Sequence, residues 1–302
     1  LMLLCTGFGM FCMMLINTTE IILTVTNQIP SHDSWFNSAR LTWPYGDAVP
    51  GNYFAKCGLI ITVLAGTLIT EEEKQKRIAG MVVGFLLLVF TVLTGERINS
   101  ILVFCTLITT VAWSGKRSLK QAVFTISFFS MATLFTFSTN TKLLKKFTGN
   151  FWYEATNFAE SGYFENWMSG LKVFYAQPFT GIGTGMYRFI CSEQIFDRSL
   201  DITCNNHPHQ FYIQTLAETG VLGFAAFTVM VLSIITLLWK EGLNSNNALK
   251  KCCFIVPLAI FFPLQSNADL FGQWINGMSW YGIALAMTVC LTREQPKANS
   301  ES

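Results

Sequence analysis

The sequence is poor in charged residues and rich in apolar ones. Of its 302 residues 13% are charged, whereas 51% are hydrophobic and 14% are aromatic. Soluble globular domains carry about 25% charged residues, so this composition argues against such a domain. The chain is therefore predicted to lie in a membrane.

Several motifs of cofactor and metal sites are also missing. The chain has no P-loop and no dinucleotide-binding glycine fingerprint, so no nucleotide cofactor is expected. It has no CxxC or HExxH pattern, and no Asp-x-Asp pair in its long polar segment. We expect no metal, no cofactor and no nucleic-acid partner.

Long uncharged runs recur along the chain. A helix needs about 20 apolar residues to cross the hydrocarbon core of a bilayer. Seven uncharged runs are close to this length. An eighth run, Cys57 to Thr70, is shorter, and Tyr53, Phe54 and a snorkelling Lys56 would extend it. The other runs are Leu1 to Thr19, Ile78 to Gly95, Ile98 to Gly115, Gln121 to Thr141, Thr219 to Trp239, Cys252 to Ala268 and Leu270 to Thr292. The sequence thus predicts an all-α polytopic membrane protein with about eight spans.

The basic residues predict which segments face the cytoplasm, because short cytoplasmic loops collect Lys and Arg. Clusters of them occur at every second crossing: Lys74, Lys76 and Arg77; Lys116, Arg117 and Lys120; Lys240, Lys250 and Lys251; and Arg293 with Lys297. The segments 17–53, 95–98 and 141–210 then lie outside. Loops of more than about 60 residues are translocated largely regardless of charge, so lysines within 141–210 do not contradict this topology.

The predicted organisation has four parts. Residues 1–140 contain transmembrane helices 1–5, residues 141–210 form one large periplasmic loop, residues 211–292 contain helices 6–8, and residues 293–302 form a cytoplasmic tail. In the large loop, an apolar stripe at helical spacing predicts a helix that lies against the membrane surface and ends before Pro178. The stripe consists of Trp167, Leu171, Phe174 and Tyr175.

Two features of the large loop each have two readings. Gly181, Gly183 and Gly185 allow positive φ and close approach to a ligand, but they also suit a flexible turn. Cys191 and Cys204 could form a disulfide in an oxidising compartment or stay as free thiols.

His207 and His209 lie just before the sixth predicted span. A neutral imidazole accepts a proton from a hydroxyl near pH 7, which suits a general base. A metal site with Cys204, Asp201 or His32 is disfavoured, because the donors lack the usual spacing. The third reading is that these histidines only cap a helix.

Four stretches resemble the signature of O-antigen ligases and O-antigen polymerases. A histidine followed by Asn, Ser or Gln, nine residues and Gly-x-x-Gly is the ligase hallmark, and His209-Gln210 with Gly220 and Gly223 matches it. The stretches are Thr94–Arg97, Gln177–Arg188 with Gly181-Ile182-Gly183 and Tyr187-Arg188, His207–Gln210, and Glu218–Gly223.

The resemblance implies a metal-independent, inverting glycosyltransferase with a GT-C-like transmembrane bundle. Its donor would be a glycan linked to undecaprenyl diphosphate, and its acceptor a sugar of lipid A-core, in lipopolysaccharide biosynthesis. The protein would lie among the lipids of a bacterial inner membrane with its active site facing the periplasm. A polymerase that extends the growing lipid-linked glycan is the closest alternative. A transporter is less expected, because the predicted spans carry few ionisable residues.

The resemblance also implies roles for individual residues. Arg97 and Arg188 would hold the diphosphate, since arginine binds such groups through charge-assisted hydrogen bonds. His209, or else His207, would be the base. The further substrate-binding candidates are Gly181, Gly183, Gly185, Gln210, Glu218 and Gly220. Some relatives carry another arginine early in the loop, which is missing between Gly162 and Asn166; Lys145, Lys146 and Lys172 are the candidate substitutes.

Overall fold

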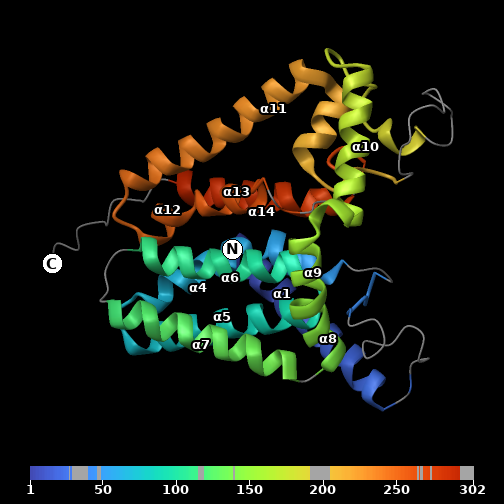
Figure 1. The fold of residues 1–302 in the computed structure, drawn as a ribbon. Helices are drawn as coiled ribbons and strands as arrows, with labels where there is room; N and C mark the ends of the chain where they lie inside the picture. Colours follow the sequence, from blue (N-terminus) through green and yellow to red (C-terminus); the bar gives the residue numbers. More distant parts are fainter. Residues whose placement is uncertain are drawn as a thin grey trace.

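A computed structural model describes residues 1–26, 28, 40–45, 49–114, 119–138, 140–190, 205–263, 265, 268–272 and 274–292. All regular elements of these residues are helices (Figure 1), which confirms the all-α class. The predicted disulfide partners Cys191 and Cys204, as well as Asp201 and His32, lie outside the described residues.

Three helices are long and apolar enough to cross a membrane: α1 (Met2–Val25), α5 (Lys74–Leu93) and α11 (Phe211–Leu243). A fourth candidate is broken. It joins α3 (Pro50–Asn52) and η2 (Tyr53–Cys57) to α4 (Leu59–Ile69) with a bend of 56°. Shorter apolar helices are α6 (Arg97–Trp113), α7 (Leu119–Ser138) and α14 (Trp274–Leu291). The chain is a helical membrane protein, and the number of eight spans stays a prediction.

Two of the predicted spans differ from continuous helices. Residues 252–268 were expected to form one span, but the structure has α12 (Ala248–Cys252) and the short α13 (Ile255–Ile260) there, followed by Pro263. Proline lacks the N–H that a continuing helix requires, so the helix stops before it. In η2, Lys56 is buried instead of snorkelling, and its ammonium lies 6.0 Å from the centroid of the Phe211 ring.

Small residues allow α4 to pack closely on its neighbours. A Cβ added to Gly80 of α5 would lie 2.7 Å from the carbonyl oxygen of Ala65, and one added to Gly66 would lie 2.8 Å from Cβ of Thr110 in α6. Close backbone approach of this kind is how helices associate in lipid, where the hydrophobic effect does not drive them together.

The large loop builds a helical layer at one end of the bundle. It contains α8 (Thr141–Lys145), η3 (Lys146–Asn150), α9 (Phe151–Thr156), η4 (Phe158–Glu160), α10 (Gly162–Ala176) and η5 (Tyr187–Phe189). Figure 1 shows α8, α9 and α10 together at this end, while α12 lies at the opposite end. The side chains of Asn140 and Ser161 cap α8 and α10 by accepting backbone N–H groups.

The predicted helix before Pro178 is present as α10. The face of α10 that is buried inside the protein is a different one from the aromatic stripe, whose place against the membrane surface stays a prediction. The buried residues are Asn166, Ser169, Gly170 and Val173. At Gly170 an added Cβ would lie 2.5 Å from a methyl group of Ile213 in α11, so a small residue is needed where the two helices meet. Tyr175 of the stripe is 73% exposed.

Candidate active site

Two glycines hold the loop after α10 against a kink in α11. Gly181 and Gly220 both have φ of +65°, a conformation that residues with a Cβ rarely adopt. A Cβ on Gly181 would lie 2.3 Å from the carbonyl carbon of Glu218, and one on Gly220 would lie 2.3 Å from that of Phe179. Both positions therefore require glycine because backbone meets backbone. We call this contact the glycine clamp.

Backbone hydrogen bonds complete the glycine clamp. The kink at Gly220 frees carbonyl groups of α11, and the loop after α10 supplies the donors. The N–H of Ile182 donates to Ala217 O over 3.1 Å, and that of Gly183 donates to Glu218 O over 2.8 Å. In return, the N–H of Val221 donates to Pro178 O over 2.8 Å. Two of the stretches that carry the family resemblance thus form one structural unit.

The carboxylate of Glu218 orders the rest of the loop. It is 1% exposed and accepts hydrogen bonds from the backbone N–H groups of Gly185, at 2.5 Å, and Tyr187, at 3.2 Å. The N–H of Gly181 donates to Gln177 O. The N–H groups of all three loop glycines therefore have partners inside the protein, and their predicted role in substrate binding stays a prediction.

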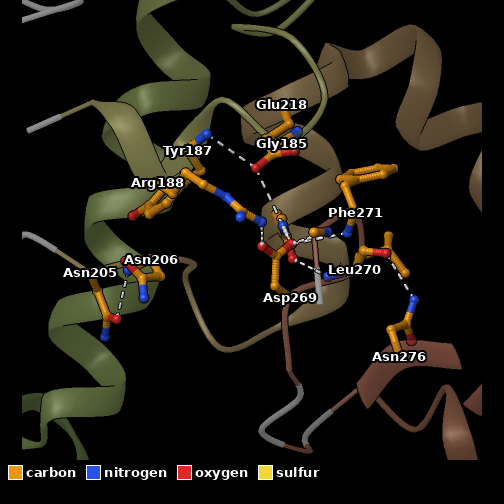
Figure 2. Close-up of polar contacts among 12 residues, drawn as sticks. Gly185, Tyr187, Arg188, Asn205, Asn206, Glu218, Asp269, Leu270, Phe271 and Asn276 are labelled. Atoms are coloured by element: carbon orange, nitrogen blue, oxygen red, sulfur yellow. Dashed lines mark hydrogen bonds and ion pairs between the residues drawn. The ribbon is translucent and has the colours of Figure 1, made fainter. Parts of the chain in front are cut away.

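A buried polar network continues from Glu218 to Arg188 (Figure 2). The amide nitrogen of Gln214 lies 3.3 Å from the Glu218 carboxylate and 2.5 Å from Oδ1 of Asp269, while the other oxygen of Asp269 accepts from Arg188 over 2.6 Å. Asp269 is 1% exposed and also caps the N–H groups of Phe271 and Gly272. This network ties the loop to the turn before α14.

A separate cavity of about 800 Å³ lies where α6, α9 and α10 meet the segment before α11. It brings together Arg97, His207 and His209 from the predicted catalytic set, whereas Arg188 and the loop glycines are not among its lining residues. Its charged and aromatic lining consists of Arg40, Lys146, Glu96, Glu154, Glu160, Tyr153, Phe158, Tyr163 and Trp167. We call it the histidine cavity.

Arg97 begins α6 and has hydrogen-bonding capacity left over. Its Nη2 pairs with Glu154 at 2.7 Å, and its side chain is 14% exposed. Its Nη1 is buried and, within the described residues, makes no hydrogen bond; the same holds for the indole N–H of Trp167. Buried donors normally have partners, so these two indicate a ligand that brings acceptor oxygens.

Lys146 adds a second kind of cation to the histidine cavity. Burial, together with the positive charges of Arg40 and Arg97, lowers the pKa of its ammonium to about 8, although Glu96 opposes this shift. Lysine 146 and Arg40 were not in the predicted catalytic set. For Lys146, the signal in the sequence was the group Lys142, Lys145 and Lys146 at the start of the large loop.

His209 occupies a strained position beside His207. Its φ is +58°, and the two imidazole rings are 4.2 Å apart. Nε2 of His209 lies 3.1 Å from the side-chain nitrogen of Asn205. Burial lowers the pKa of His209, so the ring is neutral at pH 7 and can accept a proton.

The remaining predicted residue, Gln210, caps α11. Its side-chain oxygen accepts from the N–H of Ile213 over 2.7 Å, and its amide nitrogen donates to Pro263 O over 2.9 Å. These two hydrogen bonds hold the start of α11, next to His209, against the segment that contains Pro263. Substrate contact by Gln210 stays a prediction.

In a comparison with protein families, residues 82–228 match the family described as O-antigen ligase. The matched region includes α6, the histidine cavity's loop helices and the glycine clamp. A comparison with curated proteins finds no match. This match confirms the resemblance to the O-antigen ligase family that was seen in the sequence.

Proposed function

We propose that the chain transfers a glycan from undecaprenyl diphosphate to a sugar hydroxyl of lipid A-core, as an O-antigen ligase on the periplasmic side of a bacterial inner membrane. The observation that carries this proposal is the histidine cavity, which joins Arg97 to His209 although 112 residues separate them in the sequence. The family match supports glycosyl transfer in general; the substrates and the side of the membrane are our proposal.

The cation side of the cavity suits a diphosphate. Arg97 keeps a free buried donor, Lys146 and Arg40 line the same space, and the N-terminus of α6 adds partial positive charge. A departing diphosphate carries negative charge that these groups stabilise. The carboxylates of Glu154 and Glu96 pair with Arg97 and Arg40 and keep the guanidinium groups in place.

The aromatic and imidazole side of the cavity suits a sugar. Tyr153, Tyr163 and Trp167 offer flat apolar faces and polar edges, and His209 offers a neutral base. His209 takes the proton of the acceptor hydroxyl, whose oxygen bonds to the anomeric carbon of the donor. The bond from that carbon to the diphosphate oxygen breaks, and its electron pair leaves with the diphosphate. Attack opposite to the leaving group inverts the anomeric centre.

We assign Arg188 a structural role, in which it holds elements around the site in place and does not bind the substrate. Its contact with Asp269 links the loop to the turn before α14, and it lies outside the lining of the histidine cavity. Within the described residues, no group of three or more His, Cys, Asp or Glu side chains is arranged to hold a metal ion. Metal independence belongs to the proposal.

A reconstitution experiment separates the ligase from the polymerase. Purified protein receives the lipid-diphosphate glycan with either lipid A-core or a second lipid-linked unit. Glycan attached to lipid A-core is the expected product, whereas lengthening of the lipid-linked glycan supports the polymerase. Absence of both products, in a preparation that binds the donor, contradicts the proposal.

A pair of arginine variants shows whether the histidine cavity holds the donor. Arg97→Ala is expected to lower transfer at least about a hundredfold, since it removes a preorganised charge at the leaving group. Arg77→Ala is the matched control because Arg77 lies on α5 outside the cavity lining. Equal activity in the two variants would exclude the cavity as the site.

A further inference from the structure

Asn205 lies between α10 and the candidate base. Its side-chain nitrogen is 3.2 Å from Oδ1 of Asn166, on the buried face of α10, and 3.1 Å from Nε2 of His209. Neither asparagine belongs to the residues predicted from the sequence motifs. The arrangement of these two asparagines determines which ring nitrogen of His209 carries the proton.

The orientation of the Asn205 amide follows from a third contact. The backbone N–H of Asn206 donates to Oδ1 of Asn205 over 2.8 Å (Figure 2). A backbone N–H is only a donor, so the atom it contacts is the amide oxygen. The NH₂ group therefore faces Asn166 and His209, and its two hydrogens match two acceptors.

This orientation determines the tautomer of His209. An amide NH₂ group can only donate, so Nε2 of His209 must present its lone pair to Asn205. In a neutral imidazole the proton is then on Nδ1, because the hydrogen bond made by one nitrogen sets the state of the other. Protonation of Nε2 would set an N–H against the N–H of Asn205.

We propose that Asn205 is a positioning residue, which keeps the lone pair of His209 on Nε2 and whose N–H occupies the place that the acceptor hydroxyl takes during transfer. This inference rests on the proposed function. When the acceptor enters, its O–H replaces the N–H of Asn205 as the hydrogen-bond donor to Nε2. His209 therefore accepts a hydrogen bond at Nε2 both before and after the acceptor enters. Asn166 then holds the Asn205 amide through the second hydrogen.

Other titratable and charged groups lie near His209 or line the same cavity, and they are held constant in the test. They are His207 and Tyr163, whose ring centroids are 4.2 and 6.4 Å away, and the cavity residues Arg40, Arg97, Lys146, Glu96, Glu154, Glu160 and Tyr153. Asn205→Asp and Asn206→Ala, the variants that test the inference, change none of them.

The test measures ¹⁵N chemical shifts of histidine-labelled full-length protein in detergent micelles. The chain has three histidines, so variants of His32 and His207 assign the signals. In the wild type we expect Nε2 of His209 to be unprotonated and Nδ1 to be protonated. Asn205→Asp should move the proton to Nε2 and shift the acid limb of the transfer rate upward by about one pH unit or more, because a carboxylate favours the imidazolium.

Asn206→Ala is the matched control, since it leaves the backbone N–H in place and should keep the wild-type tautomer. A protonated Nε2 in the wild type, or an unchanged tautomer in folded Asn205→Asp, overturns the inference. Failure of the proposed function has a different readout. If His209→Ala keeps full transfer activity, His209 is not the base, even where the wild-type tautomer is the one inferred.

Discussion

At the residue scale, charge decides how the histidine cavity can bind an anion. Arg97 is held by Glu154 at 2.7 Å yet keeps Nη1 without a partner among the described residues. Because Arg97 lines the cavity, this donor is available to an acceptor oxygen of a ligand bound there. Arg97 is therefore positioned in advance of its ligand, and binding does not have to order its side chain.

Lys146 gives the cavity a charge that depends on pH. With its pKa lowered to about 8, the ammonium is charged below pH 8 and becomes neutral above it. We expect the KM for the lipid-diphosphate donor to rise as pH passes above 8, and Lys146→Arg to remove that rise because arginine stays protonated. Steady-state transfer rates from pH 6.5 to 9.5 measure both effects.

A second lysine in the same stretch serves as the control for this prediction. Lys146→Ala should raise the donor KM about tenfold at pH 7, since a hydrogen bond to a charged group contributes about 1.5–3 kcal/mol. Lys145→Ala should leave it unchanged, because Lys145 is exposed and does not line the cavity. Equal effects of the two changes would show that Lys146 acts only through general charge.

At the element scale, the glycine clamp joins the loop after α10 to the kink of α11. Gly181→Ala and Gly220→Ala should each destabilise the protein by several kcal/mol, because the new Cβ would lie 2.3 Å from backbone atoms. Gly185 is the matched control: its φ is +73°, but no atom lies within 4 Å of an added Cβ. Gly185→Ala should cost only the backbone strain, about 1 kcal/mol. Thermal unfolding in detergent compares the three.

The salt bridge from Arg188 to Asp269 ties a third element, the turn before α14, to the same unit. Asp269→Asn should lower Tm, since the Arg188 charge loses its buried partner and the N–H groups of Phe271 and Gly272 lose a charged acceptor. In contrast, Arg97→Ala should lower activity with little change in Tm.

A double-mutant cycle of Arg188→Ala and Asp269→Ala should give a coupling energy of about 1–3 kcal/mol. Additive effects would show that the pair does not stabilise the fold.

The sequence predicted helices better than it predicted their contacts. Apolar runs located the three helices that are long and apolar enough to cross a membrane, since crossing demands length and low charge. They did not foresee the broken α12 and α13 segment or the buried Lys56. The aromatic stripe on α10 indicated a helix but not the face that packs on α11, where a small residue such as Gly170 is needed. That the stripe lies against the membrane surface stays a prediction.

The motifs likewise indicated the residues of the candidate site but not how these residues are divided in space. They pointed to Arg97, His209, Arg188 and the loop glycines together, whereas the structure places Arg97 and His209 at one cavity and the others in a supporting network. The partners Glu154 and Asp269 lie 57 and 81 residues from their arginines. Such pairs follow from three-dimensional packing, and no local pattern encodes them.

At the scale of the whole molecule, the loop helices and α12 lie at opposite ends of the bundle (Figure 1). Together with the positive-inside rule, this arrangement supports our proposal that the histidine cavity faces the periplasm. Alkaline phosphatase, which needs an oxidising compartment, should be active when fused after Glu160 and inactive when fused after Ser245. The reverse pattern would place the cavity on the cytoplasmic side and contradict the use of a periplasmic donor.

In the proposed mechanism, His209 performs the proton transfer in the histidine cavity. Its most direct test is the rate of glycan transfer to lipid A-core by purified His209→Gln, compared with wild type at saturating donor and with Tm measured alongside. The account predicts a loss of about 10²–10⁴-fold in that rate with Tm nearly unchanged. A folded His209→Gln variant that transfers glycan at the wild-type rate would contradict it.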